Sequence, residues 1–541
     1  MISFKDGIEN TVNEVLANSA VSYGMKTALV DQSVHLTYAD VERLSFRLAS
    51  HLIRMGLKKG DVVAVQLPNS WEFAVTHLAL ARIGLIILPV NLMYRKKELA
   101  FMLSFAEAKA VVTIDKWKAF DHAALMDELK QELPQLQHII VTGTEIRSGH
   151  HSFTTLLKTE SVHAAEEELS FFTPRPEDKM LMMFTSGTES DPKAVVHTYQ
   201  SFVPTHLQNA QEYQMSSHDT ILCLTPMSHM FSLPMLIMGL KHGARQIMLA
   251  QFSVEKTLEL IEREGVTFCV ASPTHLIDLL KGTDGRERIA SNLRLILTGG
   301  TKIPSQMVKE LRQRLGCEIA AQWGMTELGG GTFTRPADRA ELTWDTVGRV
   351  CPSGEVQIFD EEGLPVADGE VGEIGFRGLS LFAGYYKNEA GTKESFLENG
   401  FFLTGDLGWK DAEGYIHFVS RKKDTINRGG LKVHAAEIEE ALVMHPKIKQ
   451  AAVVSVPDER LGERGCAVVS FMDGETMSLE EVTEYLLRLG MAKYKLPEYL
   501  RVMDELPMTA SGKISKGMLR EEALAFGGIE SRHRDRNQTG E

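Results

Sequence analysis

The sequence predicts an α/β protein with a large N-terminal domain of doubly wound sheets and helices, and a small α+β C-terminal domain. Strand-like and helix-like segments alternate in the first part of the chain, which is typical of a parallel sheet. The 541 residues are too many for one small core, so two or more domains are expected. After Arg421 the chain changes character, and a second set of strands and helices follows.

The first expected unit of strand, helix and strand lies near the N-terminus. Thr37-Tyr-Ala-Asp40 is typical of a helix N-cap with an acidic first turn, and apolar residues then recur at helical spacing until Gly56. Residues 61–67 form the first expected strand, a helix follows, and residues 85–88 form the next strand. This order predicts that the two strands are parallel.

The same rhythm returns in the middle of the chain. Strands are expected at residues 266–271, 293–298 and 317–322, and a helix opens at Pro304. In an open parallel sheet, ligands bind outside the carboxyl ends of the strands. Loops that directly follow these strands are therefore candidates for a binding site.

We place the domain boundary near Lys423, so residues 1–422 form the N-terminal domain and residues 423–527 the C-terminal domain. The residues from 528 to 541 are polar and charged, and we expect them to be disordered. The elements expected in the C-terminal domain are a strand at 425–426, a helix at 434–444, a strand at 451–456, and a helix capped by Ser478 and Glu481.

The composition limits the possible classes of function. Hydrophobic residues make up 43% and charged residues 24%, which is ordinary for a globular protein, and the net charge of −14 argues against nucleic acid as a partner. The five cysteines lie far apart without metal-ligand spacing, which suits reduced thiols in a cytoplasmic protein.

No segment resembles a targeting or membrane-spanning sequence. The first ten residues contain no continuous hydrophobic region, so they do not predict a secretory signal. The most apolar run, residues 78–90, contains Arg82 and is too short to cross a bilayer. We expect it to be the end of a helix that leads into a buried strand, in a cytoplasmic protein without a transmembrane segment.

The most informative loop is Phe184-Thr-Ser-Gly-Thr-Glu-Ser-Asp-Pro-Lys193, directly after an apolar stretch. Its hydroxyls, its backbone N–H groups and one ammonium can replace the water shell of two phosphate groups. A Walker-type loop is excluded, because Gly187 is not followed by Gly-Lys-Ser/Thr at the required spacing. The alternative is a surface turn, which such clusters of Ser, Thr, Asp and Pro usually form.

Four more motifs follow in order. They are Gln322-Trp-Gly-Met-Thr-Glu327, Leu403-Thr-Gly-Asp406, Arg421-Lys-Lys-Asp-Thr-Ile-Asn-Arg-Gly-Gly430 and Leu506-Pro-Met-Thr-Ala-Ser-Gly-Lys513. With all five motifs the chain resembles the adenylate-forming superfamily of acyl-CoA synthetases, adenylation domains and firefly luciferase, and most of all a fatty-acid or alicyclic-acid CoA ligase. The resemblance extends from about Thr37 to about Leu519.

This resemblance implies an ATP site and a magnesium ion. Glu327 and Thr188 would coordinate magnesium, a hard cation that needs oxygen ligands, and both belong to the catalytic set. Trp323 would stack on adenine, although an aromatic residue at a strand end is more often core. The other implied nucleotide-binding residues are Thr185, Ser186, Gly187, Ser190 and Lys193 for the β- and γ-phosphates, Gly299, Gly300 and Thr301 beneath adenine and the acyl group, Gly324, Thr326 near the α-phosphate, Asp406 for the ribose, and Arg421 for the ribose or a phosphate.

The resemblance also implies a C-terminal domain that rotates between two half-reactions. Lys513 would enter the active site for the first reaction, because two unit negative charges 4 Å apart repel by about 4 kcal/mol at an effective dielectric of 20. Lys423 matches the hinge position. After rotation, Gly429, Gly430 and Lys432 would line a tunnel for the pantetheine arm of coenzyme A.

His229 matches a position that gates the acyl pocket in relatives, and a satisfied core histidine is the alternative. No aspartate lies between residues 226 and 234 to bind a substrate amine, which favours a simple carboxylic acid. Methionine and leucine residues nearby indicate either an apolar, adaptable pocket for a medium-chain, alicyclic or longer fatty acid, or a buried helix. These residues are Met227, Met230, Leu233, Met235, Leu236 and Met238.

The implied activity is an AMP-forming ligase. A small-molecule carboxylic acid would react with ATP to give an acyl-adenylate, and coenzyme A would then accept the acyl group. Two alternatives stay open: transfer to a carrier protein, and a catalytically silent nucleotide-binding protein. The second is raised by Glu189, Ser190 and Ala194, where the chain departs from the family's phosphate-loop pattern and two of its glycines are replaced. The oligomeric state does not follow from the sequence.

Overall fold

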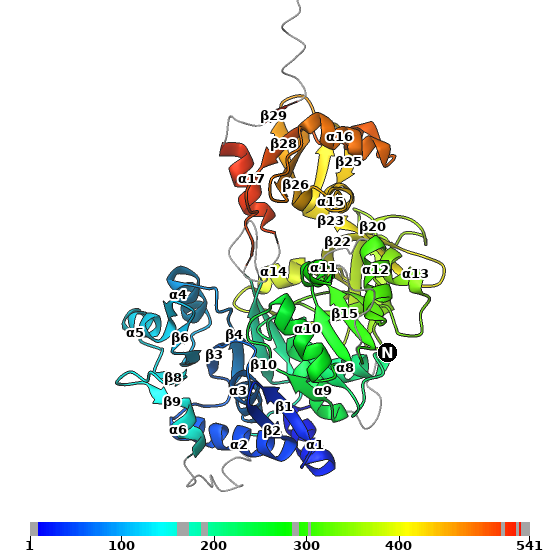
Figure 1. The fold of residues 1–541 in the computed structure, drawn as a ribbon. Helices are drawn as coiled ribbons and strands as arrows, with labels where there is room; N and C mark the ends of the chain where they lie inside the picture. Colours follow the sequence, from blue (N-terminus) through cyan, green and yellow to red (C-terminus); the bar gives the residue numbers. More distant parts are fainter. Residues whose placement is uncertain are drawn as a thin grey trace, which may run out of the picture.

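The computed structural model describes residues 9–158, 172–185, 193–283, 292–300, 305–509, 514–525 and 530–531. In these ranges the N-terminal part contains two large mixed sheets with helices, and the C-terminal part forms a smaller α+β unit (Figure 1). The predicted fold class is confirmed.

The first large sheet has eight strands in the order β21-β11-β10-β4-β3-β5-β8-β9. Neighbours from β10 to β9 are parallel, whereas β11 runs antiparallel to both β10 and β21. The strands are β3 (Val62–Gln66), β4 (Ile86–Pro89), β5 (Ala110–Ile114), β8 (His138–Thr142), β9 (His151–Ser152), β10 (Lys179–Phe184), β11 (Ala194–Thr198) and β21 (Gly384–Tyr385).

The second large sheet has nine strands in the order β18-β17-β16-β15-β14-β12-β13-β1-β2. Its centre from β16 to β1 is parallel, and β17, β18 and β2 add antiparallel edges. The strands are β1 (Thr27–Asp31), β2 (Val34–Thr37), β12 (Thr220–Cys223), β13 (Arg245–Ile247), β14 (Phe268–Ala271), β15 (Leu295–Gly299), β16 (Glu318–Met325), β17 (Gly329–Phe333) and β18 (Arg349–Val350).

Helices form three layers around the two sheets. The helices α4 (Lys96–Phe105) and α5 (His122–Glu132) cover the outer face of the eight-stranded sheet. The outer face of the nine-stranded sheet is covered by α10 (Val254–Arg263), α11 (Pro273–Gly282) and α12 (Ser305–Leu315). Between the sheets lie α3 (Trp71–Arg82), α8 (Tyr199–Glu212) and α9 (Leu233–His242), flanked by α1 (Val12–Tyr23) and α2 (Tyr38–Arg54).

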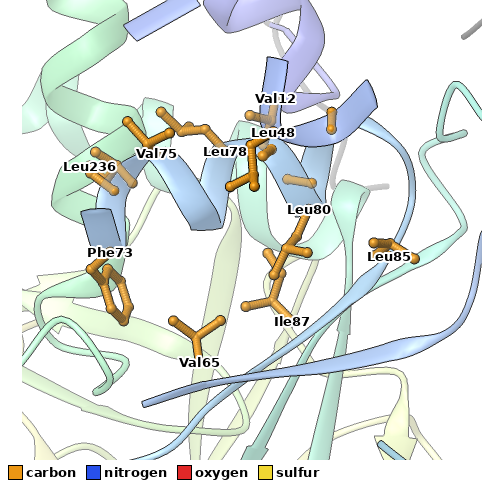
Figure 2. Packing of buried hydrophobic residues seen from close by; sticks show 14 of the residues in the cluster. Val12, Leu48, Val65, Phe73, Val75, Leu78, Leu80, Leu85, Ile87 and Leu236 are labelled. Carbon is orange, nitrogen blue, oxygen red and sulfur yellow. The ribbon is translucent and has the colours of Figure 1, made fainter. Parts of the chain in front are cut away.

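The largest core cluster lies where α1, α2, α3 and α9 meet β3 and β4. Figure 2 shows Leu48 of α2, Leu78 of α3 and Leu236 of α9 converging there, all of them fully buried. Burial of a leucine of this kind stabilises the fold by about 1.5–3 kcal/mol. The apolar run at residues 78–90 is indeed the end of α3 leading into the buried strand β4, as the sequence predicts.

Predicted helix starts are confirmed where a capping signal is present. Thr37 caps α2 through a capping box with Asp40, and the chain leaves this helix before Gly56, whose φ is +87°. Ser478 caps α16 (Leu479–Arg488) in the same way together with Glu481. Within the described ranges, none of the helices has the length and apolar character needed to cross a membrane.

A four-stranded antiparallel sheet connects the two parts of the molecule. Its order is β19-β20-β22-β23, and the short 3-10 helix η1 (Lys422–Asp424) then leads into the C-terminal sheet. The predicted boundary at Lys423 falls inside η1. The strands are β19 (Gly354–Phe359), β20 (Gly372–Gly378), β22 (Phe402–Lys410) and β23 (Ile416–Arg421).

The C-terminal unit lies at one end of the molecule, next to β22 and β23 (Figure 1). Within the predicted tail, Glu530–Ser531 pair with β28. The strands are β24 (Thr425–Arg428), β25 (Leu431–His434), β26 (Ile448–Asp458), β27 (Gly462–Phe471), β28 (Tyr499–Val502) and β29 (Glu530–Ser531), and the helices are α15 (Ala435–Val443), α16 and α17 (Lys516–Ala525). The remaining short elements are α6 (Phe153–Lys158), α13 (Ala340–Asp345), α14 (Glu389–Glu394), η2 (Lys493–Lys495), β6 (Lys116–Trp117) and β7 (Phe120–Asp121).

Candidate active site

The predicted phosphate loop is closed at its base by β10 and β11. Phe184 pairs with Ala194 across the two strands, and the backbone N–H of Thr185 donates to the carbonyl oxygen of Lys193 at 2.9 Å. The hydroxyl of Thr185 donates to the same oxygen at 3.4 Å. The sheet therefore holds the two ends of the loop together. Ser186, Gly187, Thr188 and Ser190 lie outside the described residues.

Glu327 follows β16 and is nearly enclosed, with 6% of its surface exposed. Its carboxylate oxygen Oε1 accepts a hydrogen bond from the hydroxyl of Tyr385 at 3.0 Å. Burial raises the pKa of Glu327, and the Tyr385 hydrogen bond and the charges of Lys193 and Arg421 offset this only in part. A cation near this carboxylate would favour its charged form.

Tyr385 also contacts the lysine of the phosphate loop. The Nζ atom of Lys193 lies 4.5 Å from the centroid of the Tyr385 ring, a distance that permits a cation–π interaction. Strand β21 places the ring there, because Tyr385 pairs with Val195 of β11. The sequence patterns do not single out Tyr385, since no motif surrounds it and its strand is only two residues long.

A second group of predicted residues meets where β16 approaches β22 and β23. The indole Nε1–H of Trp323 donates to Oδ2 of Asp406 at 2.7 Å. Arg421 stands opposite Asp406 in the sheet, and its Nε lies 3.6 Å from Oδ1. Trp323 is 6% exposed and belongs to a core cluster, which agrees with the core role considered for it. Its stacking on adenine stays a prediction.

The backbone around Thr326 and Glu327 is held by β11 and by the segment before β21. The Nε2–H of His197 donates to the carbonyl oxygen of Thr326 at 2.7 Å, and the backbone N–H of Phe382 donates to the carbonyl oxygen of Glu327 at 2.8 Å. Burial lowers the pKa of His197 to about 4, so the ring is neutral near pH 7. Its Nδ1 then accepts from the hydroxyl of Ser201 at 3.1 Å.

Two predicted glycines are required by close backbone contacts. A Cβ atom at Gly299 would lie 2.3 Å from the carbonyl oxygen of Gln322, and one at Gly324 would lie 1.9 Å from that of Gly329. Gly300 has a φ of +93°, a conformation that favours glycine. Thr301 lies outside the described residues.

His229 lies in the turn before α9. The ring Nδ1 of His229 accepts from the backbone N–H of Phe231 at 3.2 Å. The backbone N–H of His229 donates to the carbonyl oxygen of Pro226 at 3.0 Å. The neighbouring methionine and leucine side chains are at most 5% exposed and pack in the core, which supports the buried-helix interpretation of this stretch. They are Met227, Met230, Leu233, Met235, Leu236 and Met238.

In the C-terminal domain, the predicted residues that the structure describes lie in η1, in the turn after β24 and in β25. Gly429 and Gly430 form the turn between β24 and β25 with φ of +58° and +88°. Lys432 forms an ion pair at 2.5 Å with Glu361 of the large domain. The carbonyl oxygen of Lys423 accepts from Arg520 of α17 at 3.1 Å. Lys513 lies outside the described residues.

Comparison with known proteins identifies the class. Residues 16–386 match the family model for AMP-binding enzymes, and residues 437–513 match the model for the AMP-binding enzyme C-terminal domain. The chain therefore belongs to the AMP-binding, adenylate-forming enzyme family. It is an adenylate-forming ligase that binds ATP and activates a carboxylic acid.

Particular relatives divide between two kinds of ligase. The 2,3-dihydroxybenzoate-AMP ligase of Bacillus subtilis is 32% identical over 94% of this chain and 93% of its own. The medium-chain fatty-acid–CoA ligase of Escherichia coli is 32% identical over 92% of this chain and 88% of its own. Among solved structures, O-succinylbenzoate coenzyme A synthetase from B. subtilis in complex with ATP and magnesium has a TM-score of 0.81 at 26% identity, covering 93% of this chain and 98% of that one.

The residues present fit a magnesium ion that is held together with nucleotide. In the part of the chain that the structure describes, no three His, Cys, Asp or Glu side chains are grouped to hold a metal by themselves. Glu327 is a buried carboxylate whose pKa is raised by burial, and such an oxygen ligand suits a hard cation. The remaining ligands would have to come from phosphate oxygens, water and hydroxyls.

Proposed function

We propose that the protein is an AMP-forming carboxylic acid–coenzyme A ligase. The observation that carries the proposal is the cluster of Lys193, Tyr385 and Glu327 at the base of the phosphate loop, beside the group of Trp323, Asp406 and Arg421. The first cluster offers a cation and a carboxylate for magnesium triphosphate. The second offers an acceptor for ribose hydroxyls.

In the first half-reaction, a carboxylate oxygen of the acid attacks the α-phosphorus of ATP. The bond to the bridging oxygen breaks, and pyrophosphate leaves with the electron pair. Lys193 and the loop hydroxyls hold the β- and γ-phosphates, Asp406 and Arg421 orient the ribose, and Lys513 stabilises charge that develops between the reactants. Magnesium, when bound by Glu327 and Thr188, neutralises phosphate charge.

In the second half-reaction, the coenzyme A thiol attacks the carbonyl carbon of the acyl-adenylate. The thiol loses its proton, the bond from the carbonyl carbon to the phosphate oxygen breaks, and AMP leaves. Rotation about Lys423 would replace the face that carries Lys513 by the face that carries Gly430 and Lys432. The ion pair of Lys432 with Glu361 supports the idea that this face docks on the large domain.

For the acid, we propose an apolar carboxylic acid without an amine, of the medium- or long-chain fatty or alicyclic type. The stretch from 226 to 234 carries no charged residue, which supports a site without a partner for an amine. An aryl acid is the main competitor, because relatives such as the 2,3-dihydroxybenzoate-AMP ligase are as similar to this chain as the fatty-acid ligase.

Transfer of the acyl group to a carrier protein is a second candidate. It is favoured by one observation: the 2,3-dihydroxybenzoate-AMP ligase of B. subtilis, 32% identical over 94% of this chain, is named for an adenylate and not for a coenzyme A thioester. The two candidates share the first half-reaction and differ only in the thiol that accepts the acyl group.

A panel of fatty, alicyclic and aryl acids in an ATP–pyrophosphate exchange assay tests the first half-reaction. We expect exchange that depends on the acid, and AMP release that rises when free coenzyme A is added. The second candidate would be favoured if exchange occurs but AMP release rises only with a phosphopantetheinylated carrier protein and not with free coenzyme A. ATP binding without exchange for any acid would indicate a catalytically silent homologue.

A further inference from the structure

Tyr385 lies between the two charged side chains of the candidate active site. Its hydroxyl donates to Oε1 of Glu327 at 3.0 Å, and the Nζ atom of Lys193 lies 4.5 Å from its ring centroid. One side chain thus contacts an anion with its polar end and a cation with its aromatic face. This arrangement suits both the donor hydroxyl and the negative face of a tyrosine ring.

The backbone of Tyr385 is fixed by the sheet. The residue pairs with Val195 of β11, two residues after Lys193, and its N–H donates to the hydroxyl of Thr392 at 2.9 Å. Only 8% of its surface is exposed. The ring therefore cannot shift relative to the end of the phosphate loop unless β21 separates from β11.

The same segment also fixes the backbone of Glu327. The N–H of Phe382 donates to the carbonyl oxygen of Glu327 at 2.8 Å, and the rings of Phe382 and Tyr385 pack with centroids 4.8 Å apart. The segment from Phe382 to Tyr385 thus connects the glutamate on one sheet with the lysine on the other. This connecting segment can set the position of the Glu327 side chain relative to that of Lys193.

Because Glu327 is buried, only a few protein groups determine the orientation of its carboxylate. The residue is 6% exposed, so water has little access to the carboxylate and protein donors must take its place. A hydrogen bond to a charged carboxylate is stronger and more directional than a neutral one. The Tyr385 hydroxyl holds Oε1, and the backbone N–H of Glu327 also stabilises the charged carboxylate, so these two donors set its orientation.

We propose that Tyr385 is a positioning residue for adenylation: its hydroxyl orients the Glu327 carboxylate toward magnesium, and its ring supports the Lys193 ammonium beside the phosphates. This inference rests on the proposed function, because it requires that Glu327 and Lys193 act on magnesium triphosphate. It predicts a role in the first half-reaction alone, since the second involves no triphosphate.

The test uses Tyr385→Phe, which keeps the ring under Lys193 and removes only the hydroxyl. The matched control is Tyr386→Phe on the neighbouring residue, whose ring packs against Phe105 with centroids 6.0 Å apart, away from Glu327. Binding of a non-hydrolysable ATP analogue is measured by calorimetry in magnesium and in EDTA. This readout does not depend on turnover.

We expect Tyr385→Phe to lose about 10- to 100-fold in affinity for the analogue in magnesium and little in EDTA, as is typical when a partner of a metal ligand is removed. Pyrophosphate exchange should fall by a similar factor, while thioester formation from a supplied acyl-adenylate stays at the wild-type rate. Tyr386→Phe should behave as wild type in every assay. Equal affinities of Tyr385→Phe and wild type in magnesium would overturn the inference.

The variant Glu327→Gln distinguishes failure of the proposed magnesium site from failure of the role proposed for Tyr385. If Glu327→Gln loses the gain in affinity that magnesium gives and Tyr385→Phe keeps it, the inference is wrong and the proposed site stands. If both variants keep the gain, the proposed site fails, and the inference fails with it. If Tyr385 acts through Glu327, the double variant binds the magnesium analogue no more weakly than Glu327→Gln. A thermal transition for each variant checks that a loss is not due to unfolding.

Discussion

The carboxylate of Asp406 contacts two side chains. Its Oδ2 accepts a hydrogen bond from the Nε1–H of Trp323 at 2.7 Å, and its Oδ1 lies 3.6 Å from the Nε of Arg421. The tryptophan N–H orients this side chain, and only 8% of the aspartate is exposed. A side chain held in this way loses little freedom on binding, so it can accept ribose hydroxyls at low entropic cost.

Asp406→Ala should weaken ATP binding about 10- to 100-fold, because a hydrogen bond to a charged group contributes about 1.5–3 kcal/mol. The apparent constant for the acid should hardly change. The two constants are measured separately in the exchange assay. Trp323→Phe, which removes only the N–H donor, should give a smaller loss in the same direction. An unchanged ATP constant in Asp406→Ala would make Asp406 a turn residue without a binding role.

His77 gives the fold a sensitivity to acid that is unrelated to the site. The ring is fully buried in α3 beside Phe73, and neither nitrogen has a hydrogen-bond partner among the described residues. Burial lowers the pKa of His77 to about 3. The unfolded chain, with an ordinary histidine pKa near 6.5, therefore binds a proton below that pH that the folded chain does not.

The stability that His77 contributes is thus present above pH 6.5 and is lost as the pH falls toward 3. Between pH 7.5 and pH 5.5, this one group lowers the free energy of unfolding by about 1.4 kcal/mol. His77→Leu should lose less stability over this interval than wild type, by about that amount. Urea unfolding at both pH values measures the difference. Equal losses in the two proteins would show that His77 is protonated in the fold.

At the scale of single residues, the sequence predicted those that sit inside motifs. Lys193, Glu327, Asp406 and Arg421 are predicted as site residues because a loop, a strand end or a turn gives each a recognisable context, and the structure brings Lys193 close to Glu327 through Tyr385 and Asp406 close to Arg421. Tyr385 is not predicted from the sequence, since its contacts are with residues 193 and 327, far away in the sequence. Pairing across such distances leaves no local pattern.

The strands β16 and β17 approach each other so closely at Gly324 that no side chain fits at this position. At Gly324 a Cβ atom would lie 1.9 Å from the carbonyl oxygen of Gly329, and this contact lies three residues before Glu327. Any side chain at Gly324 must push the two strands apart. The displacement would reach the turn that carries Thr326 and Glu327.

Gly324→Ala should therefore destabilise the protein by about 1–3 kcal/mol, as overpacking usually does, and lower the adenylation rate about 100-fold through misplacement of Glu327. Thermal unfolding and pyrophosphate exchange measure the two effects. Gly465→Ala in β27 is the control, because a Cβ there would meet its nearest atoms at 3.6 Å, an ordinary contact. A Gly324→Ala protein with wild-type exchange would contradict this account of the hairpin.

Among elements, those with local signals were the predictable ones. A few adjacent residues are enough to predict the N-caps of α2 and α16 and the strands β3 and β4. The antiparallel edges of both large sheets were not predicted. Strand β21 exists only because β11 is available to pair with it, and β17 depends on the glycines that let it approach β16.

Among the described residues, one of the polar contacts that join the two domains lies at the surface. The ion pair of Lys432 with Glu361 has both side chains more than half exposed, so it contributes at most about 1 kcal/mol. Such a contact can bias the arrangement of the domains but cannot lock it. If the C-terminal domain takes the two arrangements that we propose, both share the connection through η1.

The hinge prediction concerns Lys423 in the middle of η1. Its carbonyl oxygen accepts from Arg520, and Asp424 pairs with the same arginine at 2.7 Å, so α17 holds this turn on the side of the C-terminal domain. We therefore expect the proposed rotation between half-reactions to be absorbed by the backbone torsions of η1. Hinges of this type lie away from the reacting atoms.

Lys423→Pro should separate the two half-reactions. Proline fixes its own φ near −65° and disfavours the helical conformation at Lys422, so the turn can no longer exchange freely between conformations. Because adenylation needs only one domain arrangement, we expect pyrophosphate exchange near the wild-type rate and coenzyme A-dependent turnover nearly abolished. Lys423→Ala removes the side chain and keeps the backbone freedom, so this variant should support both half-reactions. A folded Lys423→Pro protein that forms thioester at the wild-type rate would remove the support for two arrangements.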